Sequence, residues 1–148
     1  MKIKLLVSEK RYADIEKELA SFGIGIDDNA DLVLSEANSY LDCIMGKRDE
    51  EIFRIHTDEI IYIESLAHDI VAHTINGEYK LRERLWQLES MLDPQMFLRI
   101  SNSVIIAKDK VKLIRPALSQ KFTLTLADGS LVDVTRSYYY IFKDKYGI

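Results

Sequence analysis

The sequence predicts a mainly β protein with antiparallel strands, a few short helices and a small βαβ segment at the N-terminus. Short apolar runs separated by turn residues recur from residue 52 onward. Asn76-Gly77 and Asp128-Gly129 each separate two such runs, and these residues accept the positive φ of tight hairpin turns. Apolar residues at 122, 124 and 126 alternate with threonines, which is typical of a half-buried strand.

The N-terminal segment, residues 1–45, is predicted to be a small βαβ unit. Residues 2–8 and 31–35 are apolar enough for strands. Residues 11–22 form an amphipathic pattern, because Tyr12, Ile15 and Leu19 recur at spacings of three and four. The charged residues 46–51 are predicted to be a connector and the domain boundary, so that 50–148 form the second domain.

The second domain is predicted to consist mostly of short strands. We expect a helix over 82–92, ended by Asp93-Pro94, and a final helix over 137–146 with Thr135 as its N-cap. Trp86 and Leu88 are expected in the core, as are Tyr138 and Ile141-Phe142. The predicted strands are 52–56, 59–64, 70–75, 78–81, 97–100, 103–107, 111–115, 122–126 and 131–134.

Composition places the chain among ordinary globular proteins. It has 148 residues, of which 47% are hydrophobic and 30% charged, enough to bury a core without cross-links. Cys43 is the only cysteine, which fits a reducing cytoplasm. Charges follow the first apolar residues too soon for a signal peptide, and no apolar run is long enough to span a bilayer. We therefore expect a cytoplasmic protein.

The charge is unevenly distributed along the chain. The net charge is −4, but residues 97–148 contain nine lysines and arginines against four aspartates, a net +5. The first 96 residues then carry −9. A positive face on an acidic protein is compatible with nucleic-acid binding, although chance clustering of solvated charges is an equally good explanation of this pattern alone.

The loops of the last third predict where a nucleic acid would bind. If 103–107, 111–115, 122–126 and 131–134 form one meander, alternate connections fall on opposite edges. One edge then has no carboxylate and carries amide, hydroxyl and cationic groups, which suit base edges and phosphates. The alternative is that loops are polar in any protein. The residues of this edge are Asn102, Ser119, Gln120, Lys121, Arg136 and Ser137.

Residues 50–148 resemble the LytTR family of bacterial DNA-binding domains in the order and spacing of several segments. The resemblance implies an elongated fold of antiparallel β-sheets that inserts loops into successive major grooves. It also implies control of transcription at promoters with repeated short sites. The segments are 58–65 (DEIIYIES), His68, 72–74 (AHT), 85–92, 97–106 (FLRISNSVII), 126–129 (LADG) and 134–138 (VTRSY).

The resemblance also assigns candidate DNA-binding residues. His68, Asn102 and Arg136 occupy the positions at which the family places base-contacting side chains. The remaining candidates are phosphate-binding or supporting residues. These are Arg99, Ser101, Ser103, Lys121 and Ser137.

Several features depart from the family pattern. Ala107 stands where many members have asparagine, residues 117–121 (ALSQK) replace an aromatic, Asn-Gly-Arg type of loop, and the loop that carries His68 is short. Many members carry a receiver domain in front. Residues 1–45 supply only about one βαβ unit and no acidic pair follows the first strand, so we expect a short regulator without a receiver.

Enzymatic and metal-binding alternatives find little support in the sequence. His56, His68 and His73 lack a cysteine or acid that would complete a usual zinc set, and His73 is expected to be a packing residue. Cys43 has no base nearby in sequence, so we expect a structural thiol. No phosphate-binding glycine loop or nucleophile motif is present. We therefore expect no enzyme and no cofactor or metal.

The sequence thus predicts a sequence-specific transcriptional regulator that binds double-stranded DNA. A homodimer is expected if the DNA site is repeated, since two weak modules on one site add avidity. The alternative is a protein-interaction or ligand-sensing module that has lost DNA binding. Ala107, the altered 117–121 loop and the acidic first half favour this alternative.

Overall fold

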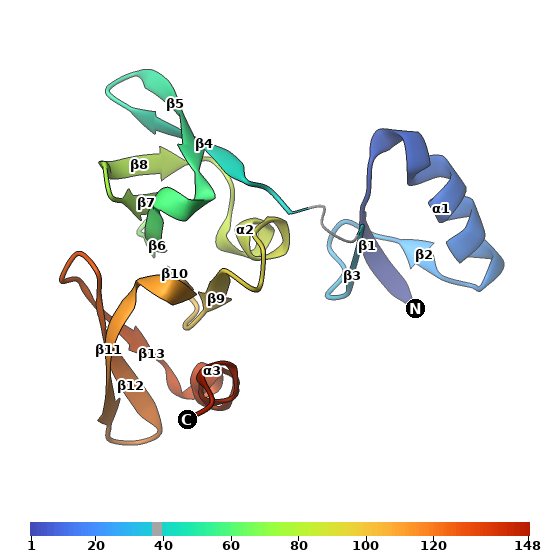
Figure 1. Ribbon diagram of the computed structural model, residues 1–148. Coiled ribbons are helices and arrows are strands. Elements are labelled where there is room, and N and C mark those ends of the chain that lie inside the picture. The colour runs from blue at the N-terminus through green and yellow to red at the C-terminus, as the bar shows by residue number, and fades with distance from the viewer. Residues whose placement is uncertain (37–39) are drawn as a thin grey trace. The chain divides into compact units, whose positions relative to one another are not determined.

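The computed structural model describes residues 1–36 and 40–148 and confirms the mainly β class. The described residues form two compact units, Met1–Tyr40 and Leu41–Ile148. Antiparallel sheets make up most of the second unit (Figure 1). No helix among the described residues is long and apolar enough to cross a membrane.

The first unit is a three-stranded parallel sheet with one helix. It contains β1 (Lys2–Leu6), α1 (Glu9–Ser21), β2 (Gly25–Ile26) and β3 (Val33–Ser35), and its strand order is β2-β1-β3. Ile3 and Leu5 of the central strand are buried. The βαβ arrangement was predicted, but the short strand β2 was not. Gly23 ends the helix with a φ of 75° and donates its N–H to the carbonyl of Ala20.

The second unit begins with a seven-stranded antiparallel sheet in the order β5-β4-β8-β7-β6-β10-β9. Ile75 and Asn76 form the turn between β7 and β8, one residue before the predicted Asn76-Gly77 turn, and of those two residues only Gly77 has a positive φ. Thr57–Glu59 form the short 3-10 helix η1 between β5 and β6. The strands are β4 (Cys43–Arg48), β5 (Glu51–His56), β6 (Ile60–Leu66), β7 (Asp69–Thr74), β8 (Gly77–Leu81), β9 (Phe97–Arg99) and β10 (Val104–Ala107).

The expected connector at 46–51 is wrong, because these residues belong to the β4–β5 hairpin. Asp49 and Glu50 make its turn with positive φ values of 50° and 66°. Gly46 lies where the hairpin packs most closely on the sheet. A Cβ at this position would come within 2.5 Å of Ile55 Cδ1 and 2.7 Å of Tyr79 Cβ. Gly46 therefore permits the close packing of β4 against β5 and β8.

The predicted four-stranded meander is also wrong, because its first strand belongs to the other sheet. Strand β10 pairs with β6 and β9, and the 3-10 turn η2 (Lys108–Lys110) follows it. Strands β11 (Val111–Ala117), β12 (Lys121–Leu126) and β13 (Leu131–Val134) form a separate three-stranded sheet. Both faces of β10 are buried: Ile105 packs into one core cluster and Ile106 into the other. A strand buried on both faces suits the boundary between two cores.

The helices of the second unit are shorter than predicted. Helix α2 spans Leu85–Met91, with Leu88 fully buried but Trp86 48% exposed, so the core prediction for Trp86 is wrong. Helix α3 spans Tyr139–Tyr146 and follows the 3-10 turn η3 (Arg136–Tyr138). Its Phe142 is fully buried, whereas Ile141 is 51% exposed.

Thr135 does not cap the last helix with its side chain. It precedes η3 in an extended conformation, and its side chain makes no capping hydrogen bond. At the other end of the helix, Gly147 adopts the left-handed conformation and terminates α3. Lys143 and Lys145 lie in the last turn, where cations interact favourably with the helix dipole.

Candidate nucleic-acid interface

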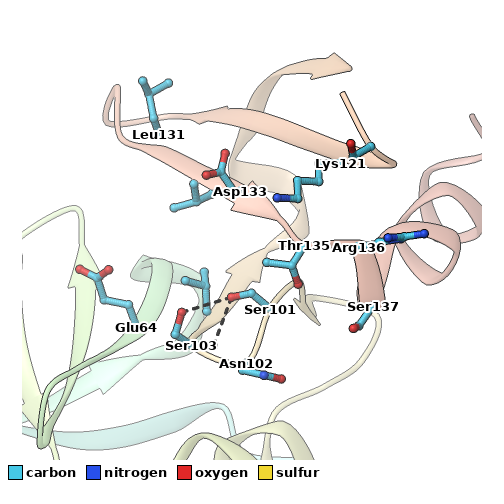
Figure 2. Close-up of a pocket in the computed structure, with 13 residues that line it drawn as sticks. Glu64, Ser101, Asn102, Ser103, Lys121, Leu131, Asp133, Thr135, Arg136 and Ser137 are labelled. Atoms are coloured by element: carbon cyan, nitrogen blue, oxygen red, sulfur yellow. Dashed lines mark hydrogen bonds between the residues drawn. The ribbon is translucent and has the colours of Figure 1, made fainter. Parts of the chain in front are cut away.

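A polar groove with a volume of about 760 Å³ lies between the two sheets of the second unit (Figure 2). Three loops and the adjoining strand ends line it: the β9–β10 turn, the β11–β12 turn and the segment after β13. Six of the eight predicted DNA-binding residues line this groove, even though the meander used to predict part of the set does not exist. These six are Ser101, Asn102, Ser103, Lys121, Arg136 and Ser137.

Backbone hydrogen bonds explain why these loops meet. The N–H of Thr135 donates to the carbonyl of Ile100 over 3.0 Å, which ties the end of β13 to the end of β9. The N–H of Ser65 donates to the carbonyl of Ser103 over 2.8 Å, which ties the same turn to β6. The β9–β10 turn is therefore held from both sheets.

The β9–β10 turn is further fixed by Arg99. Its Nε donates to the carbonyl of Ser101 over 3.0 Å, and its Nη2 to the carbonyl of Asn102 over 2.8 Å. Its Nη1 lies 3.0 Å from a carboxylate oxygen of Glu89. With three partners and a side chain only 19% exposed, Arg99 lies beneath the turn and does not line the groove. The geometry suits a supporting role rather than a phosphate contact.

The two serines of this turn differ in exposure. Ser101 is 4% exposed, and its Oγ accepts a hydrogen bond from the N–H of Ser103 over 3.2 Å. The two hydroxyls lie 3.3 Å apart. Ser103 is exposed on the groove. Ser101 therefore shapes the turn, and Ser103 is the accessible hydroxyl.

The two cations of the groove are available to a ligand. The side chains of Arg136 and Lys121 are exposed and make no hydrogen bond or ion pair with any residue that the structure describes. Figure 2 shows the Lys121 side chain reaching over the groove, while Arg136 extends outward from the start of η3. Unpaired cations beside exposed amide and hydroxyl groups are what phosphates and base edges require.

His68 lies outside the groove but at the same end of the seven-stranded sheet. It occupies the two-residue turn between β6 and β7, where Ala67 has a φ of 53°. Because β6 is antiparallel to β10, the turn after β6 and the turn before β10 share one end of the sheet. The imidazole is exposed there. The structure thus places His68 near this edge without bringing it into contact with the other candidates.

The edge is not free of carboxylates, contrary to the prediction. Glu64 at the end of β6 and Asp133 in β13 both line the groove. Asp133 accepts a hydrogen bond from Thr123 Oγ1 over 3.0 Å. The prediction failed because it considered loops only, whereas strand residues of the two facing sheets also border the groove.

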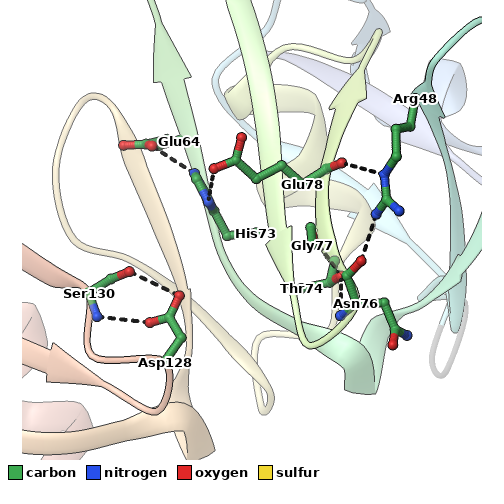
Figure 3. Close-up of polar contacts among 9 residues, drawn as sticks. All are labelled: Arg48, Glu64, His73, Thr74, Asn76, Gly77, Glu78, Asp128 and Ser130. Carbon is green, nitrogen blue, oxygen red and sulfur yellow. Dashed lines mark hydrogen bonds and ion pairs between the residues drawn. The ribbon is translucent and has the colours of Figure 1, made fainter.

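The Glu64 carboxylate is held by His73. Its Oε1 lies 2.7 Å from His73 Nε2, and Glu78 Oε1 lies 3.3 Å from His73 Nδ1 (Figure 3). The imidazole stacks on the Tyr62 ring at 4.1 Å and an interplanar angle of 5°. Burial raises the pKa of the Tyr62 phenol, which favours its neutral form beside these acids. His73 is thus a packing residue, as predicted, and also a polar partner of the two carboxylates.

Cys43 has a base nearby, which the sequence did not show. Its Sγ lies 3.3 Å from His56 Nδ1, because the two residues face each other across β4 and β5. A hydrogen bond to Cys43 raises the pKa of the Arg54 guanidinium. Within the described ranges, no group of three His, Cys, Asp or Glu side chains could hold a metal ion.

The second unit combines antiparallel sheets with a groove at which three loops present cationic and amide side chains. These features are those of a nucleic-acid-binding protein of the β type. Residues 50–147 match the model of the LytTr DNA-binding domain family. The match covers more than half of the chain, and the chain belongs to this family.

Solved and curated relatives agree with this assignment. A LytTr DNA-binding domain from Bacillus cereus superposes with a TM-score of 0.70 at 20% identity, over 73% of this chain and 99% of that one. An uncharacterised HTH-type transcriptional regulator of Staphylococcus aureus strain bovine RF122 is 30% identical over 105 residues, 71% of each chain. A second such regulator, of strain MSSA476, is 27% identical over 100% of this chain and 99% of its own length.

The chain is also similar to part of a longer protein. The sensory transduction protein LytT of Bacillus subtilis is 28% identical over 115 residues, 74% of this chain but 46% of that protein. Although the staphylococcal relatives are described as HTH-type, no two α-helices follow each other directly in the described parts of this chain. The family assignment therefore rests on the match of residues 50–147 to the family model, and the β fold agrees with it.

Proposed function

We propose that this protein is a sequence-specific transcriptional regulator that binds double-stranded DNA through the loops around the groove. Its place in a DNA-binding domain family supports DNA as the ligand. The groove is the observation that supports assigning DNA binding to this surface. Three loops present Arg136, Lys121 and Asn102 together, and both cations are without partners among the described residues.

The residues fall into three roles in this proposal. His68, Asn102 and Arg136 contact base edges in the major groove, since amide and guanidinium groups match the donor and acceptor pattern found there. Lys121, Ser103 and Ser137 bind phosphates. Arg99 and Ser101 hold the β9–β10 turn in shape, as their hydrogen bonds indicate.

The proposal also covers where the protein acts, whether it is an enzyme, and how many copies bind the DNA. The protein acts in the cytoplasm without catalysing a reaction, and its partner is DNA rather than a membrane. Two copies bind a repeated site, because pairing two weak modules on one DNA raises the overall affinity. The DNA-binding domain comprises the second unit, which begins at Leu41 rather than at the predicted residue 50, and the N-terminal segment ends at residue 40 rather than 45.

A fluorescence-polarisation titration of the full chain tests the proposal. The probe is duplex DNA from the region upstream of the protein's own gene, and a scrambled duplex of equal length is the control. We expect saturable binding that falls steeply with salt and exceeds binding to the scrambled duplex. No binding to either duplex at low salt would reject the proposal.

A second function is favoured by one observation. Glu64 and Asp133 place carboxylates on the groove, and a phosphate would be repelled by them. A protein-interaction or ligand-sensing module that has lost DNA binding would tolerate such groups. The two functions are distinguished by the same titration, because only the regulator binds DNA with a steep salt dependence.

A further inference from the structure

Two tyrosine hydroxyls near the C-terminus hold two amide side chains of the groove loops. The hydroxyl of Tyr138 donates to Asn102 Oδ1 over 3.4 Å. The Nε2 of Gln120 donates to the hydroxyl of Tyr140 over 3.0 Å. Both amides are exposed, and both tyrosines lie in the short stretch that begins with Arg136.

The Asn102 amide is oriented with its oxygen toward Tyr138. Tyr138 is half-buried against the core cluster that contains Ile106, and its N–H donates to the carbonyl of Thr135 over 2.9 Å. The backbone carbonyl of Asn102 is itself fixed by Arg99. With Oδ1 engaged, the amide nitrogen is the group that has no partner among the described residues. Asn102 therefore presents hydrogen-bond donors.

The Gln120 amide is held the opposite way. Gln120 lies in the β11–β12 turn between two residues that line the groove, Ser119 and Lys121. Its backbone φ of 58° fixes the turn. Because Nε2 is engaged by Tyr140, the carbonyl oxygen Oε1 is the atom left without a partner within the described residues. Gln120 therefore presents a hydrogen-bond acceptor.

The rings that carry these hydroxyls are anchored. Tyr140 packs edge-on against Tyr139 at 5.2 Å and an interplanar angle of 85°. Tyr139 stacks on the buried Phe122 at 4.9 Å and 11°. Stacked and edge-on aromatic contacts restrict ring motion. The hydroxyl of Tyr139 makes no hydrogen bond within the described residues, which makes Tyr139 a matched control.

We propose that Tyr138 and Tyr140 are positioning residues that make Asn102 a donor and Gln120 an acceptor toward base edges. Asn102 would then select a major-groove acceptor, such as guanine O6 or N7 or thymine O4. Gln120 would select an amino group, that of adenine N6 or cytosine N4. This inference rests on the proposed DNA-binding function and adds the chemical class of base group that each loop recognises.

Selection from a randomised duplex library with the full chain tests the inference. Base preference is compared for the wild type, Tyr138→Phe, Tyr140→Phe and the control Tyr139→Phe. We expect each of the first two variants to lose preference at one base position, a different one for each, by about fivefold or more. Tyr139→Phe should keep the wild-type profile. Affinity for non-specific duplex and the melting temperature should stay unchanged in all three.

A charge-matched pair of variants tests the donor and acceptor assignment directly. Asn102→Asp and Gln120→Glu each add one negative charge, but a carboxylate can only accept. Asn102→Asp should abolish the preference at its base position. Gln120→Glu should keep the preference at its own position, because its acceptor remains, while both lose similar overall affinity.

The outcomes separate the inference from the function on which it rests. A wild-type chain that enriches no sequence overturns the proposed function and the inference with it. If the wild type enriches a site but the two tyrosine variants keep its full profile, the inference alone is wrong. It is also wrong if Tyr138→Phe and Tyr140→Phe weaken binding to all sequences equally, or if Gln120→Glu loses its preference as Asn102→Asp does.

Discussion

At the scale of single residues, exposure and hydrogen bonding separate side chains that the sequence treats alike. Arg99 and Arg136 are both arginines beside loops of the same edge. The guanidinium of Arg99 contacts two backbone carbonyls and Glu89. The side chain of Arg136 is exposed and has no partner among the described residues. The first side chain shapes a turn, and the second remains available to DNA.

Arg136→Ala should reduce specific DNA binding while leaving non-specific binding largely intact. A base contact by arginine contributes about 1–3 kcal/mol of discrimination, so affinity for the specific duplex should fall by roughly fivefold to a hundredfold or more. Competition titrations against a set of single-base-pair variants measure this change. Arg54→Ala, on the opposite edge strand β5, is the control and should bind as the wild type does. Equal affinities for the two variants would contradict the role of Arg136.

The sequence predicted the polar and cationic residues of the groove but not their partners. Asn102, Lys121 and Arg136 were found from loop positions and from family resemblance. The roles of Tyr138 and Tyr140 depend on residues 36 and 20 positions away. Such separations leave no local pattern, because only folding brings the hydroxyls to the amides.

At the scale of elements, local signals predicted most strands but not the hairpin β4–β5. The Asn76-Gly77 pair predicted the β7–β8 hairpin, because both residue types favour positive φ. Asp49-Glu50 adopts positive φ without either glycine or asparagine, so its turn was hidden among charged residues. Gly46 then broke the apolar run of β4 further. The pairing of β10 was missed for a different reason, since strand order within a sheet is a tertiary property.

Gly46→Ala tests the close packing of that hairpin. The added Cβ would meet Ile55 and Tyr79 at distances that well-packed atoms do not tolerate. Forcing extra carbon into a packed site costs about 1–3 kcal/mol of unfolding free energy. Urea unfolding measures the loss. Gly25→Ala is the control, because its Cβ would lie 3.7 Å from the nearest atom, an ordinary contact. If both variants unfold at the same urea concentration, Gly46 is not a packing constraint.

Tyr146 anchors helix α3 and should make stability sensitive to alkaline pH. Its hydroxyl donates to the carbonyl of Lys108 over 2.8 Å, and burial raises its pKa to about 12. An unfolded tyrosine ionises near pH 10. The stabilising contribution is therefore complete below about pH 10 and is lost as the pH rises through about 12.

Urea unfolding of the wild type and Tyr146→Phe across this pH range measures the effect. Below pH 10 the variant should be less stable by about 1 kcal/mol, the typical contribution of one hydrogen bond. The difference should shrink, then reverse, as the phenol of the wild type is forced to ionise. A difference that stays constant from pH 8 to 12 would contradict the raised pKa of Tyr146.

At the scale of the whole molecule, charge distribution reconciles an acidic protein with a DNA ligand. The total is −4, yet residues 97–148 carry +5 and supply both cations of the groove. The carboxylates of Glu64 and Asp133 limit this positive field. Each has an internal partner, His73 for Glu64 and Thr123 for Asp133. DNA binding should therefore depend on a small number of unpaired cations.

Lys121→Ala should weaken binding to all duplexes alike and reduce its dependence on salt. Each phosphate contact releases about 0.9 counterions from duplex DNA, so the slope of log affinity against log salt should fall by about 0.9. Titrations from roughly 50 to 200 mM salt, against specific and scrambled duplexes, measure both slopes. Lys145→Ala, an exposed lysine in the last turn of α3 that does not line the groove, is the matched control. An unchanged slope for Lys121→Ala, or an equal reduction for Lys145→Ala, would show that attraction comes from the overall field of residues 97–148. The slope thus separates a localised phosphate contact from general electrostatic attraction.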